Sequence, residues 1–479
     1  MWLIREIVEI VLFVVQEVYK LLTGSPDLEA LEVGVYRVMN EATRRLLEAA
    51  CRNLDERLLE QRDKRRLRSV HTRARTVLTP FGELRIERRY YVDREGGRGR
   101  YLLDEVLGLE PRQRLSPWLR KVAVALAAEM PYRRAAEVLR VVTLENVDIR
   151  GMTLWQEVQE AGAELRRRAV KGQRKVFEEG ELPAGGRRAR RLYVEADEVW
   201  VRGRGQQRHV GIKLAVGYEG KAEVAPGRRL LEQRRVHAGV VSGAEFWDEC
   251  VAEFGQHWDL GAVEEYEIGG DGAAWVKAGC EHFPGARYRL DPFHLRRALL
   301  EGLSHDEGAY QAVCEGLAAG DWGEVDRALR GAQGRSRGAE RRRVVALRRY
   351  LQANWEGIRA TDAGERLGAI EGQVFHHLAR RMKRQGARWS DAGADHLARV
   401  LAVRANGELQ AVVRPRRQAQ PEGVQRLLRD RRLIAELERG QDPEEWLRAR
   451  VPALYGPGAG SPWVRYVLRQ LAHILPQIA

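Results

Sequence analysis

Two stretches of the chain decide its fold, Arg191-Leu-Tyr-Val-Glu-Ala-Asp-Glu-Val-Trp-Val201 and Glu265-Tyr-Glu-Ile-Gly-Gly-Asp-Gly-Ala-Ala-Trp275. Each is an apolar run typical of a buried β-strand. Each also carries an aspartate: Asp197 lies within the first run and Asp271 at the end of the second. A carboxylate on or just past a buried strand costs free energy unless a cationic group lies against it. The two aspartates, with Glu371 on a helix predicted later in the chain, therefore indicate a divalent-metal site.

The elements around these runs predict the topology of one sheet. We expect three strands at 191–202, 208–218 and 229–240, followed by a helix at 242–258. A strand at 264–270, a short helix after Asp271 and a last strand at 286–291 complete the order. Three consecutive strands form a meander, and strands joined through helices lie parallel. This order matches the ribonuclease-H-like fold, β-β-β-α-β-α-β-α once the helix of Glu371 is added. The expected class is therefore multidomain α+β.

Glu371 opens a predicted helix near the end of that core. The inner face of the helix is expected to hold Glu371, Val374, Phe375, Leu378 and Met382, at spacings of 3, 4, 7 and 11 residues. Such spacing places the carboxylate on the buried stripe of the helix.

Asp197, Asp271 and Glu371 have the chemistry of a phosphodiester-cleaving site. Mg²⁺ prefers oxygen ligands, and two such ions roughly 3.5–4 Å apart activate an attacking oxygen and stabilise a leaving one. We expect all three residues to be metal ligands and catalytic, with Mg²⁺ as the cofactor and Mn²⁺ tolerated. Each has another explanation: a strand-end charge paired with an arginine, a helix cap, or a glutamate near the positive end of a helix dipole. Glu195 is a rival to Asp197, because it shares a face of the strand.

The tetrapeptide Asp291-Pro-Phe-His294 closes the fifth predicted strand. Asp291 as an N-cap and Pro292 at the first helical position explain it structurally. His294, one turn into the helix, is nevertheless expected beside the carboxylates, where it would hold the scissile phosphate. We therefore count His294 among the predicted catalytic residues.

Four motifs together resemble a known family: Val194-Glu-Ala-Asp-Glu-Val-Trp-Val201, Gly270-Asp-Gly-Ala-Ala-Trp275, Leu290-Asp-Pro-Phe-His-Leu295 and Ile370-Glu-Gly-Gln-Val-Phe-His-His377. Their order is similar to that of bacterial DDE transposases of the Lre-type insertion sequences, relatives of the Mutator-like group. The resemblance runs from about residue 76 to 401. It implies that Asp197, Asp271 and Glu371 are the catalytic triad, with Asp291 and His294 as an accessory motif. The N-terminal helix and the extreme C-terminus match nothing in that family.

Charge and composition agree with a nucleic-acid partner. Lys and Arg number 82 against 68 Asp and Glu, a formal net charge of +14, which favours a polyanion. Genomic base composition or a hot habitat would also enrich arginine. The four cysteines form no CxxC pair, which indicates a reducing compartment. Glu6, Glu9 and Glu17 interrupt the apolar N-terminus, so we expect an amphipathic helix, no membrane segment and a cytoplasmic, nucleoid-associated protein.

Changes in pattern divide the chain into expected domains. A helical region for dimerisation (1–70) precedes a small β-rich segment (71–114), a helix-turn-helix-like DNA-binding domain (115–170) and a basic linker (171–190). The ribonuclease-H-like core (191–298) is followed by a helical insertion (299–366), the last part of the core with Glu371 (367–405) and a C-terminal helical region (406–479). A plain three-helix bundle is the alternative for 115–170, and a hairpin with a charged outer face is the alternative for the β-rich segment.

These expectations combine into one hypothesis. The chain is expected to be a DNA transposase that cuts element ends and transfers the strands into target DNA. Its partners would be double-stranded DNA, as terminal inverted repeats and target, and a second copy of itself in a homodimer or larger assembly. The alternatives are a non-catalytic or domesticated DNA-binding protein and a ribonuclease-H-like nuclease without strand transfer.

Overall fold

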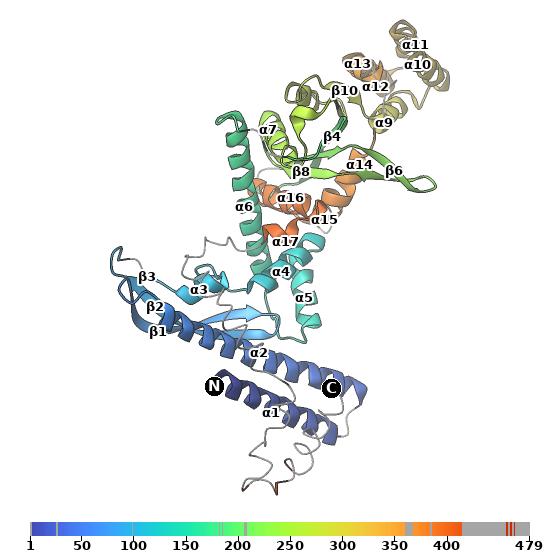
Figure 1. The fold of residues 1–479 in the computed structure, drawn as a ribbon. Helices are drawn as coiled ribbons and strands as arrows, with labels where there is room; N and C mark the ends of the chain where they lie inside the picture. The colour runs from blue at the N-terminus through green and yellow to red at the C-terminus, as the bar shows by residue number, and fades with distance from the viewer. Residues whose placement is uncertain are drawn as a thin grey trace. The chain divides into compact units, whose positions relative to one another are not determined.

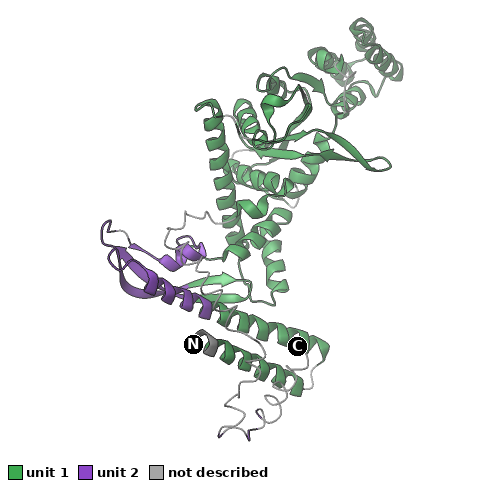
Figure 2. Cartoon of the chain, viewed as in Figure 1, with its two compact units in different colours: residues 1–48, 76–85, 112–415 green, residues 49–75, 86–111, 416–479 purple. Residues whose placement is uncertain are grey.

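The computed structural model describes residues 2–24, 27–97, 99–181, 183, 185–205, 208–359, 367–383, 386–413, 457, 460, 461 and 464. It is a mixed α and β structure with several sheets (Figure 1). The chain divides into two compact units: residues 1–48, 76–85 and 112–415 form the larger, and residues 49–75, 86–111 and 416–479 form the smaller (Figure 2). The predicted C-terminal helical region lies almost wholly outside the described residues.

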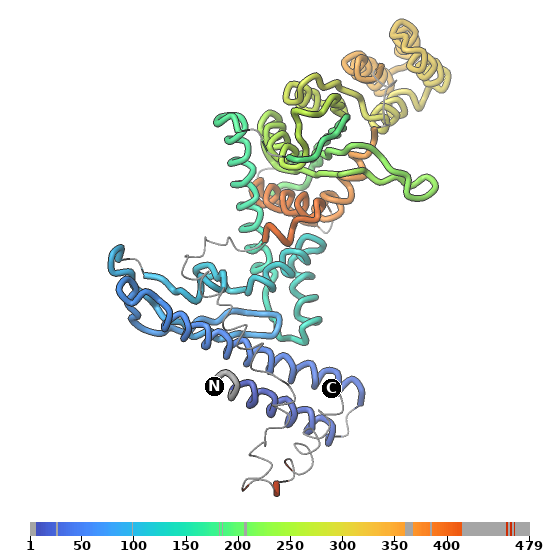
Figure 3. Tube along the Cα trace, viewed as in Figure 1, coloured from blue at the N-terminus to red at the C-terminus, as the bar shows by residue number. Residues whose placement is uncertain are grey.

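The larger unit is built on a five-stranded sheet in the order β10-β9-β4-β5-β8. The strands are β4 (Arg191–Arg202), β5 (His209–Tyr218), β8 (Arg235–Gly239), β9 (Glu265–Gly270) and β10 (Arg287–Leu290). β4, β5 and β8 form an antiparallel meander, whereas β9 and β10 lie parallel to β4. The meander and the parallel strands expected from the sequence are thus confirmed, and the path of the chain can be followed in Figure 3.

Both faces of the sheet are covered, which explains why its strands read as nearly continuous apolar runs. Along β4, Leu192, Val194 and Ala196 belong to a core with α7 (Gly243–Phe254). The alternate residues, including Tyr193 and Val199, belong to a core with α4 (Pro117–Glu129), α6 (Gly151–Phe177) and α16 (Asp391–Ala405). Asp197 and Glu195 therefore lie on the second face, since side chains alternate along a strand.

The third strand differs from the prediction. Residues 229–240 were expected to form one strand, but the structure divides them. β7 (Arg228–Glu232) pairs only with β6 (Gly220–Ala225) in a two-stranded hairpin, and β8 alone joins the sheet. Gln233 has φ of +53°, a backbone conformation that breaks a strand. The residues of β7 are mostly exposed, and those of β8 mostly buried.

The chain before the sheet forms helices and a small second sheet. Helices α1 (Trp2–Thr23) and α2 (Leu28–Gln61) are followed by β1 (Leu67–Thr79), β2 (Gly82–Asp93), β3 (Gly99–Arg100) and α3 (Leu102–Leu107). The β-rich segment expected at 71–114 begins slightly earlier, since β1 starts at Leu67. Among the described residues no helix is long and apolar enough to cross a membrane.

Three helices then lead into the sheet: α4 (Pro117–Glu129), α5 (Tyr132–Val142) and α6 (Gly151–Phe177). Ser116 is the N-cap of α4, because its hydroxyl accepts a hydrogen bond from the Leu119 N–H at 3.2 Å. The basic linker expected at 171–190 begins inside α6, which continues to Phe177. Residues 171–177 are helical because α6 packs along α7 and α16, and the backbone of Gly172 approaches Ala252 of α7.

Helices follow the last strand and end the described core. α9 (Pro292–Leu303), α10 (Glu307–Ala319), α11 (Trp322–Arg335), α12 (Gly338–Ala353) and α13 (Trp355–Arg359) enclose an apolar cluster of their own. A helical stretch then runs through α14 (Ile370–Val374), a π-helical turn η4 (Phe375–Ala379) and α15 (Arg380–Met382). α16 (Asp391–Ala405) and α17 (Leu409–Val412) complete it.

Candidate metal centre

Three aspartates lie in register across the parallel strands. Ala196 pairs with Gly270, and Gly270 pairs with Leu290. The residue after each of these is an aspartate, namely Asp197, Asp271 and Asp291. Because neighbouring parallel strands run in the same direction, the three residues gather at one edge of the sheet.

Asp197, His294 and Glu371 form a compact cluster at that edge. One potential ligand atom from each lies within 4.8 Å of the others. A strand, the start of α9 and the start of α14 supply the three side chains. The structure therefore brings together two of the three predicted metal ligands and the predicted catalytic histidine.

Asp197 is a buried carboxylate in an acidic surrounding. It is 9% exposed, and its Oδ1 accepts a hydrogen bond from the Glu198 N–H at 2.7 Å. Burial raises the pKa of Asp197 to about 6, and the negative charges of Asp271 and Glu371 act in the same direction. Such an environment favours a cation beside the carboxylate.

His294 is held between acidic groups. Its Nδ1 lies 3.5 Å from Oδ2 of the fully buried Asp291, a distance too long for a strong hydrogen bond. Burial lowers the pKa of His294, but the contact with Asp291 and the negative charge of Asp197 outweigh it, and the net pKa is raised. Asp291 also caps α9, since its Oδ1 accepts a hydrogen bond from the Phe293 N–H at 2.7 Å. The Asp291 carboxylate thus caps α9 and also contacts His294.

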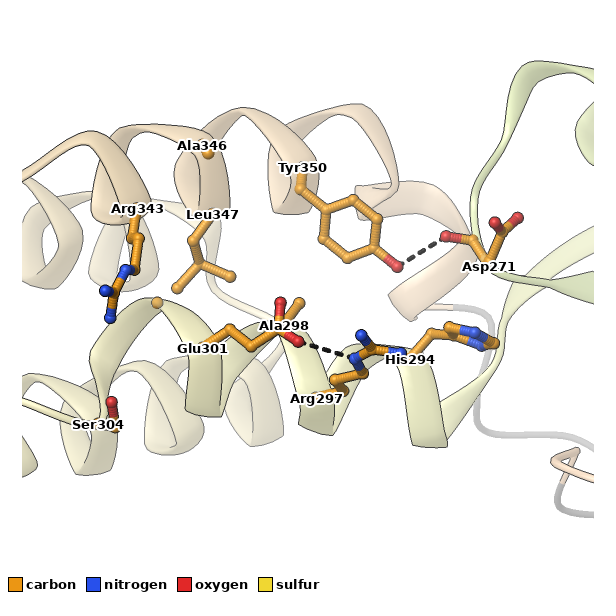
Figure 4. Close-up of a pocket in the computed structure, with 11 residues that line it drawn as sticks. Asp271, His294, Arg297, Ala298, Glu301, Ser304, Arg343, Ala346, Leu347 and Tyr350 are labelled. Atoms are coloured by element: carbon orange, nitrogen blue, oxygen red, sulfur yellow. Dashed lines mark hydrogen bonds and ion pairs between the residues drawn. The ribbon is translucent and has the colours of Figure 1, made fainter. Parts of the chain in front are cut away.

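Asp271 lies beside the cluster but outside the group of three. Its Oδ1 accepts a hydrogen bond from the Ala273 N–H at 2.9 Å, within the turn after β9. The helix cap considered as an alternative is not formed, because the N-cap of α8 (Ala274–Lys277) is Ala273 and no side chain caps it. The Tyr350 hydroxyl donates to its backbone carbonyl at 2.7 Å, as Figure 4 shows. Asp271 thus acts electrostatically on Asp197 and His294 in this conformation.

The position of Glu371 on its helix differs from the expectation. Val374, Leu378 and Met382 are buried as predicted, but Glu371 and Phe375 are exposed. The buried stripe instead begins at Ile370, and the π-helical turn shifts the phase of the residues after Val374. Glu371 therefore lies at the edge of the buried face of its helix, with a carboxylate oxygen within 4.8 Å of one of Asp197. Single π-helical turns are frequent at functional sites.

Glu195 anchors the start of this helix, a role that the sequence did not reveal. Its carboxylate is fully buried and accepts hydrogen bonds from the N–H groups of Gly368, Ala369 and Ile370 at 2.9–3.2 Å. The Tyr218 hydroxyl donates a fourth at 2.5 Å. Glu195 and Asp197 are on one face of β4 as expected, but Glu195 positions Glu371 through the backbone.

A cavity of about 670 Å³ opens beside the cluster (Figure 4). Asp271, His294 and Tyr350 line its inner end, and residues of α9 and α12 line the remainder. Arg297 pairs with Glu301 across one helical turn at 2.7 Å, while Arg343 extends from α12 on the opposite wall. The site is thus reached through a space between the sheet edge and the helices after β10.

Side chains of the β-rich segment and of the predicted DNA-binding domain make contacts within the protein. Arg88 forms an ion pair with Asp104, and Arg89 forms one with Asp55. Gln159 of α6 lies 2.9 Å from Nδ1 of a histidine on α16. The two ion pairs agree with the alternative of a hairpin with a charged outer face for the β-rich segment. The contact of Gln159 agrees with the alternative of a plain three-helix bundle for 115–170.

Comparisons with known proteins place the chain in one family. A 25% identical protein from Caldanaerobacter subterraneus subsp. tengcongensis is matched over 398 residues, 81% of this chain and 76% of that protein. A Streptococcus gallolyticus protein described as "UPF0236 protein in vanSb 3'region" is 26% identical over 408 residues, 82% of this chain and 86% of the other. The model of the "Uncharacterised protein family (UPF0236)" matches residues 21–419. The chain therefore belongs to the uncharacterised protein family UPF0236.

Proposed function

We propose that this protein is a DNA transposase of the DDE type, which cuts DNA strands at element ends and joins them to target DNA. The observation that carries the proposal is the gathering of Asp197, His294 and Glu371 within 4.8 Å. These residues are far apart in the sequence, and two of them are carboxylates. Phosphoryl transfer by metal-dependent enzymes depends on such a constellation.

The strand order supports a ribonuclease-H-like core. In order of appearance along the chain, the five strands are arranged fifth, fourth, first, second and third across the sheet, with only the second antiparallel to the rest. That arrangement is the one expected for this fold. The acidic residues follow the parallel strands at one edge, as the fold requires of its active site.

The donor set fits a small divalent cation. Asp197 and Glu371 would hold the ion through carboxylate oxygens, which suit Mg²⁺ and also Mn²⁺. When bound, the metal would activate the attacking oxygen and stabilise the leaving one. Asp271 would complete the set if its second carboxylate oxygen turned toward the ion, since only Oδ1 accepts the hydrogen bond from the Ala273 N–H.

The protein's own groups have defined tasks in this proposal. Asp291 and Asp197 stabilise the protonated form of His294, so its imidazolium would donate a hydrogen bond to a non-bridging phosphate oxygen. Glu195 holds the backbone that carries Glu371. The net charge of +14 would attract duplex DNA, both the terminal repeats and the target. Bringing two ends together requires a dimer or larger assembly.

The names of relatives give independent support. One Caldanaerobacter protein name joins eleven gene designations of a single genome, and another joins four. Many copies of one protein in one genome are the expected outcome of an element that inserts new copies of itself.

The test uses duplex DNA with the sequence that flanks the gene. Asp197→Asn and Glu371→Gln should lower strand cleavage at least about 100-fold, because even outer-shell partners of a metal cost 10- to 100-fold, while DNA affinity stays within about 3-fold. Mn²⁺ binding, measured by electron paramagnetic resonance, should weaken in parallel. Glu198→Gln is the matched control, since Glu198 pairs with Lys213 on the opposite face.

Three outcomes would contradict the proposal in different ways. Full cleavage by Asp197→Asn would remove the assigned site. Cleavage without joining of a pre-cut 3′ end to a second duplex would indicate a nuclease. Binding without any cleavage in Mg²⁺ or Mn²⁺ would indicate a non-catalytic DNA-binding protein.

A further inference from the structure

A second cavity, of about 590 Å³, lies away from the carboxylate cluster and is lined by cations. Five arginines, from four separate stretches of the larger unit, border it, and its lining contains no aspartate or glutamate: Arg133, Arg150, Arg204, Arg381 and Arg388. We call this the arginine pocket. Among the described residues, no carboxylate lies within 4 Å of any of the five guanidinium groups. Many other arginines of the chain are paired, so the pocket concentrates uncompensated positive charge.

Two buried polar atoms of the arginine pocket make no hydrogen bond of good geometry among the described residues. They are Nη2 of Arg381 and the hydroxyl of Tyr132, which interact with each other. The Arg381 guanidinium is held in place by a hydrogen bond from Nε to the Ala127 carbonyl at 3.0 Å and lies 5.0 Å from the Tyr132 ring. A buried donor with a poorly aligned acceptor costs free energy, and a bound phosphate oxygen would satisfy it better.

The pocket also has a flat apolar side and a helix end. Trp155 and Met152, in the first turns of α6, are 40% and 63% exposed. The N-cap position of α6 is Arg150, whose side chain makes no capping hydrogen bond. The first N–H groups of a 27-residue helix therefore add to the positive potential. An aromatic face beside guanidinium groups suits a base attached to a phosphate.

The chain connects this pocket to the carboxylate cluster along two elements. Arg381 follows Glu371 by ten residues of helical backbone, about 15 Å at 1.5 Å per residue. Arg204, two residues past the end of β4, follows Asp197 by seven residues, at most about 23 Å. Phosphates of one DNA strand are spaced about 3.4 Å apart along the helix axis. The separation corresponds to about four to seven nucleotides.

From these observations we infer that the arginine pocket binds the DNA strand several nucleotides from the position of cleavage, with guanidinium groups on its phosphates and Trp155 against a base. This inference rests on the proposed function. It assigns a second contact on the substrate, separate from the residues that act on the scissile phosphate.

The first experiment measures affinity by fluorescence anisotropy with a labelled 30-bp duplex of the sequence that flanks the gene. Removing three exposed arginines of the pocket should weaken binding at least about 10-fold, because each phosphate contact contributes to affinity; the variant is Arg133→Gln, Arg150→Gln and Arg388→Gln. The matched control removes three exposed arginines of α12 and should change affinity less than about 3-fold; it is Arg341→Gln, Arg342→Gln and Arg349→Gln. Circular dichroism verifies that both variants are folded.

The second experiment locates the DNA directly. A photoreactive p-benzoylphenylalanine at Met152 should form a covalent adduct with the duplex on irradiation. The same residue at Phe177, exposed at the other end of α6, should not. No adduct at Met152, or equal adducts at both positions, would overturn the inference.

The outcomes separate the pocket from the proposed function. If the unmodified protein does not bind the duplex, the transposase proposal fails and the pocket inference fails with it. If the unmodified protein binds and the pocket variant binds equally well, or no more weakly than the α12 control, the pocket inference alone is wrong.

Discussion

Glu195 illustrates how a residue beside a candidate site can act without touching a substrate. Its carboxylate accepts three backbone N–H groups and one hydroxyl, and these fix where the helix of Glu371 begins. Gly368 has φ of +110°, which favours glycine and lets the N–H groups converge. The position of the Glu371 carboxylate therefore depends on a side chain 176 residues earlier in the sequence.

Replacing Glu195 should move Glu371 more than it weakens the fold elsewhere. Glu195→Gln removes the charge and leaves fewer acceptor sites, so we expect a loss of about 2–3 kcal/mol in the free energy of unfolding, typical of hydrogen bonds to a charged group. Mn²⁺ affinity and strand cleavage should fall as well. Urea unfolding, electron paramagnetic resonance and a cleavage assay measure the three effects.

The matched variant is Tyr218→Phe, which removes one donor and keeps the three backbone contacts. It should cost about 1 kcal/mol and leave Mn²⁺ affinity within about 3-fold. Equal loss of Mn²⁺ affinity in both variants would show that Glu195 does not act through the backbone of residues 368–370.

For single residues, the sequence identified the members of the candidate site but not all of their roles. The spacing of apolar runs located Asp197 within a strand, Asp271 at the end of a strand and His294 at the start of a helix, because such patterns are local features. It could not separate Asp271 from the group of three, because that depends on a hydrogen bond to Ala273. The sequence also could not assign a role to Glu195, because its hydrogen-bond donors, the N–H groups of residues 368–370, are distant in the sequence.

At the scale of elements, the turn after β9 is fixed by the helices that follow the sheet. Gly272 has φ of +92°, and a Cβ there would lie 2.6 Å from Oδ1 of Asn354. Asn354 follows α12, and the hydroxyl of Tyr350 on the same helix holds the Asp271 carbonyl. The orientation of Asp271 is therefore coupled to α12.

Gly272→Ala tests this coupling. We expect it to lower the free energy of unfolding by about 2–3 kcal/mol, because backbone strain adds to the contact with Asn354, and to reduce strand cleavage. Gly285→Ala is the control: Gly285 has φ of +69° with no atom within 4 Å of its Cβ position, so it should cost about 1 kcal/mol. Thermal unfolding and a cleavage assay compare the two. Equal effects would mean that α12 does not constrain the turn.

Prediction of the elements succeeded where local pattern decides them. The meander and the parallel strands form as expected, because the alternation of apolar runs and helical segments is a local feature. Residues 229–240 were misassigned because two short strands follow each other closely, and the positive φ of Gln233 that separates them cannot be recognised from local pattern. The inner face of the Glu371 helix was misassigned at Glu371 and Phe375, because the buried residues recur at every fourth position, Ile370, Val374, Leu378 and Met382.

At the scale of the whole larger unit, a buried charge network joins elements from both layers of the sheet. Glu249 of α7 accepts hydrogen bonds from Arg399 of α16, at 2.9 and 3.0 Å, and contacts His237 of β8 at 2.9 Å. Arg399 also donates to Asp395 at 3.0 Å, and Arg166 of α6 lies 3.8 Å from that aspartate. A signal was present in the sequence, since Asp395 and Arg399 are four residues apart on an otherwise apolar helix.

This network makes the stability of the fold dependent on pH. Burial alone would raise the pKa of Glu249, but His237 and Arg399 outweigh it and lower the pKa to about 2, from an ordinary value of 4.5. A carboxyl with a lowered folded-state pKa contributes stability above its unfolded pKa, and that stability is lost as pH falls from about 4.5 to about 2. The difference corresponds to about 3 kcal/mol.

Comparison of the unmodified protein with Glu249→Gln isolates this contribution. At pH 7 the variant should be less stable by about 3 kcal/mol, and the difference should shrink toward zero near pH 2, because protonation neutralises the same carboxyl in the unmodified protein. Urea unfolding followed by circular dichroism at pH 7, 4.5 and 3 measures it. Glu340→Gln, at an exposed position of α12, controls for the loss of one charge and should show no such dependence. A stability difference that stays constant from pH 7 to pH 3 would contradict the prediction, because it would mean that ionisation of Glu249 does not stabilise the fold.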